Sequence, residues 1–281
     1  MNLSKQIFAY LKITRPLNVA LTFFVVVVAI LISKQDDVNW LIIFLASLSA
    51  AFTTASGNII NDIFDIETDR ISHPNRALVL GVLTKKSAAI EYLLLNLFAI
   101  IIAGYLSIKL MLIVLISIII LFLYSYSFKK KPLIGNVTVA FLTGLAFIYG
   151  GIAAENPVAA IVPAVFAFLI NLIREVVKDM QDVEGDIKAG VSTFPIKFGF
   201  QNSKIIIVIS TIILIFCTLY PFITQLYKIE YFLIVMLFVN PLLILCIKYL
   251  FDVNKENKLS TVSNILKINM VLGLIAIYLG K

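Results

Sequence analysis

Long apolar runs constrain this chain more than any other feature of its sequence. Nine of them are long enough to cross a hydrocarbon layer of ~30 Å as helices, at residues 17–33, 38–60, 88–107, 108–124, 134–153, 157–177, 204–222, 229–250 and 262–280. With 61% hydrophobic and 14% charged residues, the chain falls outside the range of soluble domains. We therefore expect an all-α, polytopic membrane protein with nine transmembrane helices.

The distribution of Lys and Arg predicts how these helices are oriented. With the N-terminus in the cytoplasm, nearly all of the 23 Lys and Arg residues lie on the cytoplasmic side, as cytoplasmic loops favour; the exceptions are Lys34, Lys109, Lys228 and Lys281. The net charge of +7 is then a basic rim facing anionic membrane lipid and requires no nucleic acid. We expect a multi-pass protein of the cell membrane, without an obligate protein partner.

Two acidic stretches share one spacing, DxxDxxxD. Both follow an apolar run, and their acids are Asp62, Asp65 and Asp69 in the first and Asp179, Asp182 and Asp186 in the second. In the nine-span arrangement four crossings separate the stretches, so both face the cytoplasm, as a duplicated helical unit requires. We expect one domain over residues 1–281, built from two repeated units with Asp motifs near 61–69 and 179–186.

The spacing of these acids indicates a metal site. If each stretch extends its preceding helix, its three acids share one face. Two such carboxylates ~6 Å apart repel each other by roughly 3 kcal/mol at an effective dielectric constant of about 20. Mg²⁺ is a natural counterion, because it takes a few carboxylates together with phosphate oxygens. One such acidic stretch alone would be ordinary solvated surface, but its repetition favours carboxylates that hold Mg²⁺ and a diphosphate.

Residues beside the first acidic stretch bear on the same site. Asn58 and Asn61 could add amide oxygens to it, although Asn58 could instead cap a helix. Glu67 lies outside the shared pattern, so we expect it to be solvated. His73, the only histidine, has no metal-ligand spacing around it and is interpreted as a loop residue.

Several motifs resemble those of the UbiA superfamily of intramembrane prenyltransferases. They are NDIFDIETD (61–69) and DMQDVEGD (179–186), together with ITRP (13–16), HPNR (73–76) and STFPIKFG (192–199). The resemblance covers the whole chain. It implies a helical bundle around a central cavity, Asp motifs on the cytoplasmic side, and Mg²⁺-dependent transfer of a prenyl group from an allylic diphosphate.

The acceptor of the prenyl group stays open between two classes. Residues 174–199 are most similar to the branch that transfers a geranylgeranyl group to geranylgeranylglyceryl phosphate, a lipid phosphate. Branches that prenylate aromatic acceptors (4-hydroxybenzoate, dihydroxynaphthoate or homogentisate) share much of this stretch. The family's Pro-Ser-Gly-like turn is replaced by RALVLGVLT (76–84), in which Gly81 remains, so we expect an altered loop without lost chemistry.

Basic residues near the motifs are candidates for contacts to the diphosphate, because Arg and Lys match phosphate oxygens. They are Arg70, Arg76, Lys129, Lys130 and Lys178. The Lys run at 129–131 could equally anchor the topology.

Other polar residues near the predicted helix ends have two readings each. Tyr124 could stabilise a carbocation or be an ordinary interfacial aromatic. Arg15, with Asn18, could bind the carboxylate or phosphate of an acceptor, or could only flank a span on the cytoplasmic side. Asn171 and Arg174 could line a polar cavity or form hydrogen bonds between helices.

Two other classes of membrane protein fit poorly. The CDP-alcohol phosphotransferases need a Gly-Ala-Arg arrangement that neither acidic stretch has. A transporter would place its acids near the middle of the bilayer in broken helices, whereas all six Asp residues follow predicted spans at one side.

Overall fold

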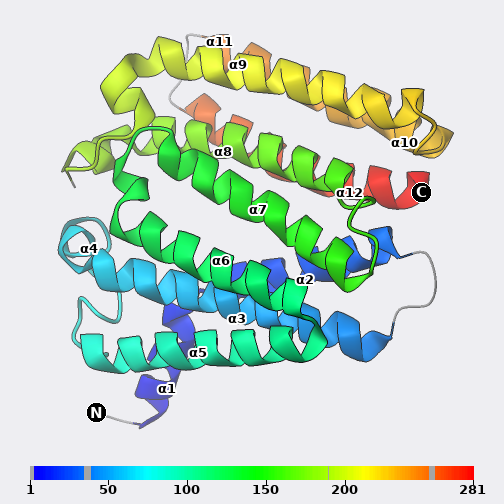
Figure 1. Ribbon diagram of the computed structural model, residues 1–281. Coiled ribbons are helices and arrows are strands. Elements are labelled where there is room, and N and C mark those ends of the chain that lie inside the picture. Colours follow the sequence, from blue (N-terminus) through cyan, green and yellow to red (C-terminus); the bar gives the residue numbers. More distant parts are fainter. Residues whose placement is uncertain (1–2, 35–38, 189, 253–256) are drawn as a thin grey trace. The chain divides into compact units, whose positions relative to one another are not determined.

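The computed structural model describes residues 3–34, 39–188, 190–252 and 257–281 (Figure 1). Val38, the predicted start of the second span, and Lys255, predicted on the cytoplasmic side, lie outside these residues. Every regular element in the described part of the chain is helical, which confirms the all-α prediction.

The helices fall into two compact units, Met1–Lys129 with Ala146–Ala160 (unit 1) and Lys130–Leu145 with Ile161–Lys281 (unit 2). Unit 1 holds α1 (Leu3–Ile13), α2 (Pro16–Ser33), α3 (Trp40–Phe64), α4 (Ile66–Ser72), α5 (Lys85–Leu106) and α6 (Ile108–Tyr126). Unit 2 holds α8 (Ile161–Lys188), α9 (Phe194–Ile223), α10 (Ile229–Ile234), η2 (Val235–Val239), α11 (Asn240–Phe251) and α12 (Asn257–Gly280). The short η1 (Phe128–Lys130) precedes α7 (Ile134–Ala153), which contributes to both units.

Eight helical segments in the described residues are long and apolar enough to cross a membrane. They are α2, α3, α5, α6, α7, α9, the continuous stretch Ile229–Phe251, and Lys258–Gly280 of α12. The remaining predicted span, 157–177, falls on α8, whose charged residues Arg174, Glu175 and Lys178 come too early for an apolar window of that length. Two shorter helices, α1 and α4, were not among the predicted elements.

Local side-chain bonds in unit 1 define where its helices begin. The Thr84 hydroxyl accepts a hydrogen bond from the amide of Ser87, and the Ser87 hydroxyl accepts one from the amide of Thr84, forming a capping box that starts α5. Ser107 caps α6 in the same way through the amide of Leu110. The two predicted spans that almost touch at residue 107 are therefore separate helices.

Close packing joins the part of α7 in unit 1 to α2 and α3. Gly150 lies against Ala29, where any added Cβ would clash, and the hydroxyl groups of Tyr149 and Ser49 share a hydrogen bond. Val26, Ile30 and Tyr149 belong to one buried apolar cluster.

Unit 2 contains two departures from regular helix. Helix α9 begins at Phe194, before residue 204, where the predicted span starts. Gly199 (φ 86°) forms a kink inside α9, which joins the turn before it to the long helix after it. Pro241 follows the π-helical turn η2 and has no N–H for the preceding turn. The side-chain amide of Asn269 in α12 donates to the carbonyl of Val239 at 2.9 Å. A carbonyl of the distorted stretch therefore has a hydrogen-bond partner on a neighbouring helix.

Candidate active site

The first Asp motif does not lie on one uninterrupted helix. Helix α3 ends at Phe64, and Asp65 (φ −93°, ψ 2°) caps it before α4 begins at Ile66. The hydrogen bonds continue across the break, since the amide of Asp65 donates to Asn61 and the amide of Asp69 to Asp65, at 3.0 and 2.7 Å. The stretch thus extends its preceding helix with one break, at Asp65, which the expectation of a continuous helix did not include. Asp62 and Asp69 share Arg76 across this break, whereas Asp65 pairs with Lys129.

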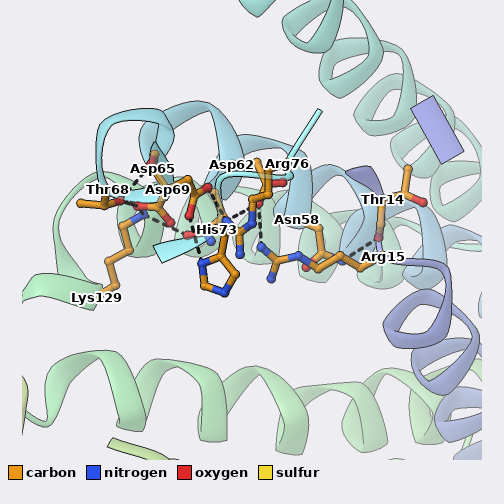
Figure 2. A network of polar contacts seen from close by, with 11 residues as sticks. Thr14, Arg15, Asn58, Asp62, Asp65, Thr68, Asp69, His73, Arg76 and Lys129 are labelled. Carbon is orange, nitrogen blue, oxygen red and sulfur yellow. Dashed lines mark hydrogen bonds and ion pairs between the residues drawn. The ribbon is translucent and has the colours of Figure 1, made fainter. Parts of the chain in front are cut away.

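Two arginines pair with acids of the first motif, and one of them bridges two of these acids (Figure 2). Arg15 donates to Asp62 at 2.6 Å, and Arg76 donates to Asp62 at 3.1 Å and to Asp69 through the same nitrogen, Nη1. Asp62 and Asp69 are buried, with side chains 8% and 6% exposed. Burying a carboxylate is costly unless it is paired and hydrogen-bonded, so the arginines are what allow both acids to lie here.

The remaining acid of the motif, Asp65, is paired with a lysine of η1, more than sixty residues later in the chain. The Lys129 ammonium donates to Asp65 and, at 3.0 Å, to the side-chain oxygen of Asn61. His73, at the end of α4, places its Nδ1 3.6 Å from Asp69. Every carboxylate of the first motif thus has a cation beside it, and His73 has a contact that its interpretation as a loop residue did not include.

Arg15 reaches Asp62 from a strained backbone position. It has φ 55° and ψ 73° at the junction of α1 and α2, in the left-handed region that a residue with a side chain rarely adopts. The side-chain amide of Asn58 donates to the carbonyl of Thr14 at 2.8 Å and holds this junction against α3 (Figure 2). Asn58 uses its nitrogen in this way, so its side-chain oxygen is the atom that could serve a metal.

The second Asp motif lies within α8, which runs unbroken from Ile161 to Lys188, as predicted for a stretch that extends its helix. Asp179 accepts a hydrogen bond from the Asn136 amide of α7 at 2.8 Å. Burial raises the pKa of Asp179 to about 6, against the lowering effect of that hydrogen bond. Burial and the nearby Asp182 raise the pKa of Asp186. Among the described residues, neither Lys nor Arg forms an ion pair with any acid of this motif.

The other predicted contact residues are spread over both units. Arg70 pairs with Glu67 at 3.0 Å on an exposed surface, which confirms the solvated position expected for Glu67. Asn18 is exposed on the first turn of α2, and Tyr124 is half-buried near the end of α6.

In unit 2 the predicted residues turn to local partners or to the surface. Asn171 donates within its own helix to the carbonyl of Ala167, and Arg174 pairs with the adjacent Glu175, both at 2.9 Å. Lys130 and Lys178 are exposed.

Sequence reasoning missed Asn136. It is buried near the start of α7 and holds the most buried acid of the second motif. The available signal was an amide inside an apolar run, which is the same observation that singled out Asn58.

The donor set of both motifs suits Mg²⁺, because carboxylate and amide oxygens are the hard ligands that this ion prefers. Asp62 and Asp69 are buried acids that require a counter-charge in any state of the site. Within the described residues, however, no three His, Cys, Asp or Glu side chains are already arranged around a common metal position. In the first motif the reason is visible, since its oxygens are turned to Arg15, Arg76 and Lys129. The Asp residues of the two motifs are expected to face each other. Because the motifs lie in different units, this stays a prediction.

Comparison with known proteins agrees with the motifs over nearly the whole chain. Digeranylgeranylglyceryl phosphate synthase of Methanosphaera stadtmanae is 32% identical over 96% of this chain and 98% of its own. The protein of the same name from Methanobrevibacter smithii is 36% identical over 96% and 97%.

Solved structures of two proteins are also similar to this chain. One described as a digeranylgeranylglyceryl phosphate synthase in membranes superposes with a TM-score of 0.87 at 30% identity, covering 98% of both chains. A UbiA homolog from Archaeoglobus fulgidus bound to GPP and Mg²⁺ shares the fold, with a TM-score of 0.67 at 22% identity over 96% of this chain and 99% of its own.

The UbiA prenyltransferase family profile matches residues 22–271, a range that includes both Asp motifs. This match agrees with the resemblance drawn from the motifs. The chain belongs to the UbiA prenyltransferase family.

Proposed function

We propose that this protein transfers a geranylgeranyl group from geranylgeranyl diphosphate to geranylgeranylglyceryl phosphate with the help of Mg²⁺. The observation that carries the proposal is similarity at 30% identity or more, end to end, to proteins whose name states that product. An aromatic acceptor is the alternative that the sequence left open, and no feature of the structure favours it.

The reaction breaks the bond between the allylic carbon and the diphosphate oxygen, and the diphosphate leaves with the electron pair. The resulting allylic carbocation is attacked by a lone pair of the acceptor hydroxyl, and the hydroxyl proton passes to the released diphosphate. Charge develops on the leaving group, so cationic groups aimed at it lower the barrier. Mg²⁺ would add to this by neutralising diphosphate oxygens while bound to the Asp carboxylates.

The residues that could hold the donor are already gathered in unit 1. Arg15, Arg76 and Lys129 carry N–H groups suited to diphosphate oxygens. Arg70, Lys130 and Lys178 are exposed, and we assign them to the outer field that attracts the donor. The three acids of each motif, with Asn58 and Asn61 as further oxygen donors, are the proposed Mg²⁺ ligands.

The acceptor side rests on fewer contacts. Arg15 and Asn18 stay candidates for the acceptor phosphate, and Asn171 and Arg174 for a polar wall of the cavity. Tyr124 is the proposed aromatic shield of the carbocation.

Membrane placement completes the proposal. We assign the predicted span 157–177, which includes the first part of α8, as a ninth span, because residues 157–173 carry no charge and the acidic end of α8 projects beyond them. With the N-terminus in the cytoplasm, both motifs then lie on the cytoplasmic side of the membrane. The acceptor would enter from the surrounding lipid.

A panel of acceptors tests the proposal. Purified protein with Mg²⁺ and a C20 donor is expected to release diphosphate when geranylgeranylglyceryl phosphate is supplied, and less with a C15 donor. 4-Hydroxybenzoate, 1,4-dihydroxy-2-naphthoate and homogentisate are expected to be inert. Turnover with the aromatic acids alone would make the proposed acceptor wrong, and turnover in the double variant D65A/D182A would make the proposed metal-binding role of the motifs wrong.

A further inference from the structure

The first Asp motif is balanced in charge by its own unit. Three carboxylates, Asp62, Asp65 and Asp69, face three permanent cations that come from separate segments of the chain. These cations are Arg15 between α1 and α2, Arg76 after α4, and Lys129 in η1. The bonds are direct, and two of the three acids are buried.

Binding of a divalent ion to these carboxylates without a diphosphate has a free-energy cost. The ion must displace charge-assisted hydrogen bonds, which are stronger than hydrogen bonds between neutral groups. The displaced cations would stay close to the new positive charge and would repel it. Arg15 has little freedom to withdraw, because its backbone is fixed between α1 and α2 and Asn58 holds the neighbouring carbonyl.

A diphosphate removes both obstacles. Its oxygens accept the same N–H groups that the carboxylates now accept, and guanidinium matches phosphate geometry as well as it matches carboxylate. The carboxylates are then left for a metal whose charge the diphosphate balances.

We propose that Arg15, Arg76 and Lys129 keep the first motif closed to divalent metal until a diphosphate takes over their N–H groups, so that metal and diphosphate bind this motif together. The inference rests on the prenyl diphosphate chemistry proposed above. The three cations act here as positioning residues for the metal ligands. Because coupling is reciprocal, the diphosphate strengthens metal binding by the same factor by which the metal strengthens diphosphate binding.

Metal binding by the full-length protein in detergent, without prenyl substrate, tests the inference. Mn²⁺ titration followed by electron paramagnetic resonance is the measurement. Arg76→Met removes the cation that bridges Asp62 and Asp69, and it is expected to tighten Mn²⁺ binding at the first motif at least tenfold, which corresponds to about 1.4 kcal/mol. Arg70→Met removes an equal charge that pairs only with exposed Glu67, and is expected to change the affinity less than twofold.

Asp69→Asn identifies which motif is responsible. Added to Arg76→Met, it is expected to abolish the tightening, whereas alone it should leave metal-only binding within twofold of the original protein. The inference is overturned if Asp69→Asn alone weakens metal-only binding tenfold, or if Arg76→Met binds Mn²⁺ no more tightly than Arg70→Met. Should Arg76→Met fail to fold, the Asp69→Asn variant decides.

The second arm adds inorganic pyrophosphate and measures its affinity by calorimetry with and without Mg²⁺. A gain of at least tenfold from Mg²⁺ is expected in the original protein and a smaller gain in Asp69→Asn; equal gains would contradict the inference. The metal-only titration uses no acceptor, so it stands whatever the acceptor panel gives. If the protein is an active transferase but Arg76→Met does not change Mn²⁺ affinity, the inference is wrong and the proposed function stands.

Discussion

The two Asp motifs share a spacing but differ in their surroundings. The first is split by a helix break at Asp65, and each of its carboxylates has a cation beside it. The second lies on one continuous helix, and its Asp179 accepts a hydrogen bond from the neutral amide of Asn136. Identical spacing therefore yields a charge-balanced site in one unit and an acidic one in the other. Helix continuity and neighbouring side chains decide how available each carboxylate is to a metal.

Turnover should depend strongly on both motifs despite this difference. Asp65→Ala and Asp182→Ala are each expected to lower the rate by roughly 100- to 1,000-fold, the usual cost of removing one preorganised electrostatic group. Diphosphate release with saturating donor and acceptor is the measurement. Glu67→Ala, an exposed acid of the same stretch outside the pattern, is the control and should stay within about twofold, since surface substitutions seldom matter. An Asp182→Ala enzyme as fast as this control would reduce the second motif to solvated surface.

Stability should separate the two motifs. Asp62→Ala leaves Arg15 and Arg76 without their shared buried partner and is expected to cost about 2 kcal/mol or more in the free energy of unfolding. Asp182→Ala removes an exposed carboxylate without an ion pair and should change it by less than about 0.5 kcal/mol. Denaturant unfolding in detergent, without Mg²⁺ or donor, is the measurement. Equal losses in the two variants would break the comparison.

The pH dependence of metal use should report on the second motif. Asn136 lowers the pKa of Asp179 from what burial alone would impose, so Asn136→Leu is expected to raise that pKa above its value of about 6. A raised pKa means fewer ionised carboxylates on the acid side. The Mg²⁺ concentration for half-maximal rate should therefore increase up to about tenfold near pH 6.5, where one pKa unit is worth about 1.4 kcal/mol. The variant and the original protein should converge by pH 8.5, where both are ionised; a difference that is constant across pH would point to a packing defect.

The smallest effect is expected at the outer surface of the first motif. Arg70→Gln breaks an exposed ion pair three residues apart on α4, which is typically worth about 0.2–0.5 kcal/mol. The Michaelis constant for the donor should rise less than about threefold, and the rise should shrink as salt screens the outer field. A larger rise that salt does not reduce would move Arg70 from the outer field into direct contact with the diphosphate.

Much of this architecture could be predicted from the sequence, because hydrophobic length and basic residues act over whole segments. The separation of α5 from α6 at Ser107 is one case, since a capping side chain marks it locally. The same rules missed α1 and α4, which are too short to appear as spans. The apolar run also begins later than α9 does. The residues from Phe194 to the kink at Gly199 are helical but do not belong to the apolar run.

The acids of the site could be found from their repeated spacing, but their partners could not. Arg15 and Lys129 reach the first motif through tertiary packing, and nothing in their own neighbourhood assigns either to a particular Asp. Asn136 stood out as an amide inside an apolar run, but nothing near it in the sequence assigned it to Asp179. The break at Asp65 also escaped, since the main-chain hydrogen bonds continue across it and the residue types around it remain compatible with helix.

The interleaved chain of the two units has a consequence for biosynthesis. Unit 1 includes Ala146–Ala160, which follows the Lys130–Leu145 segment of unit 2 in the chain. A nascent chain that has reached only Lys129 lacks Tyr149 for the Ser49 hydroxyl and Gly150 for the packing against Ala29. The first half of the enzyme therefore cannot be finished before the second is begun, and a fragment cut at Lys129 would lack the contacts that α2 and α3 make with α7 in the complete protein.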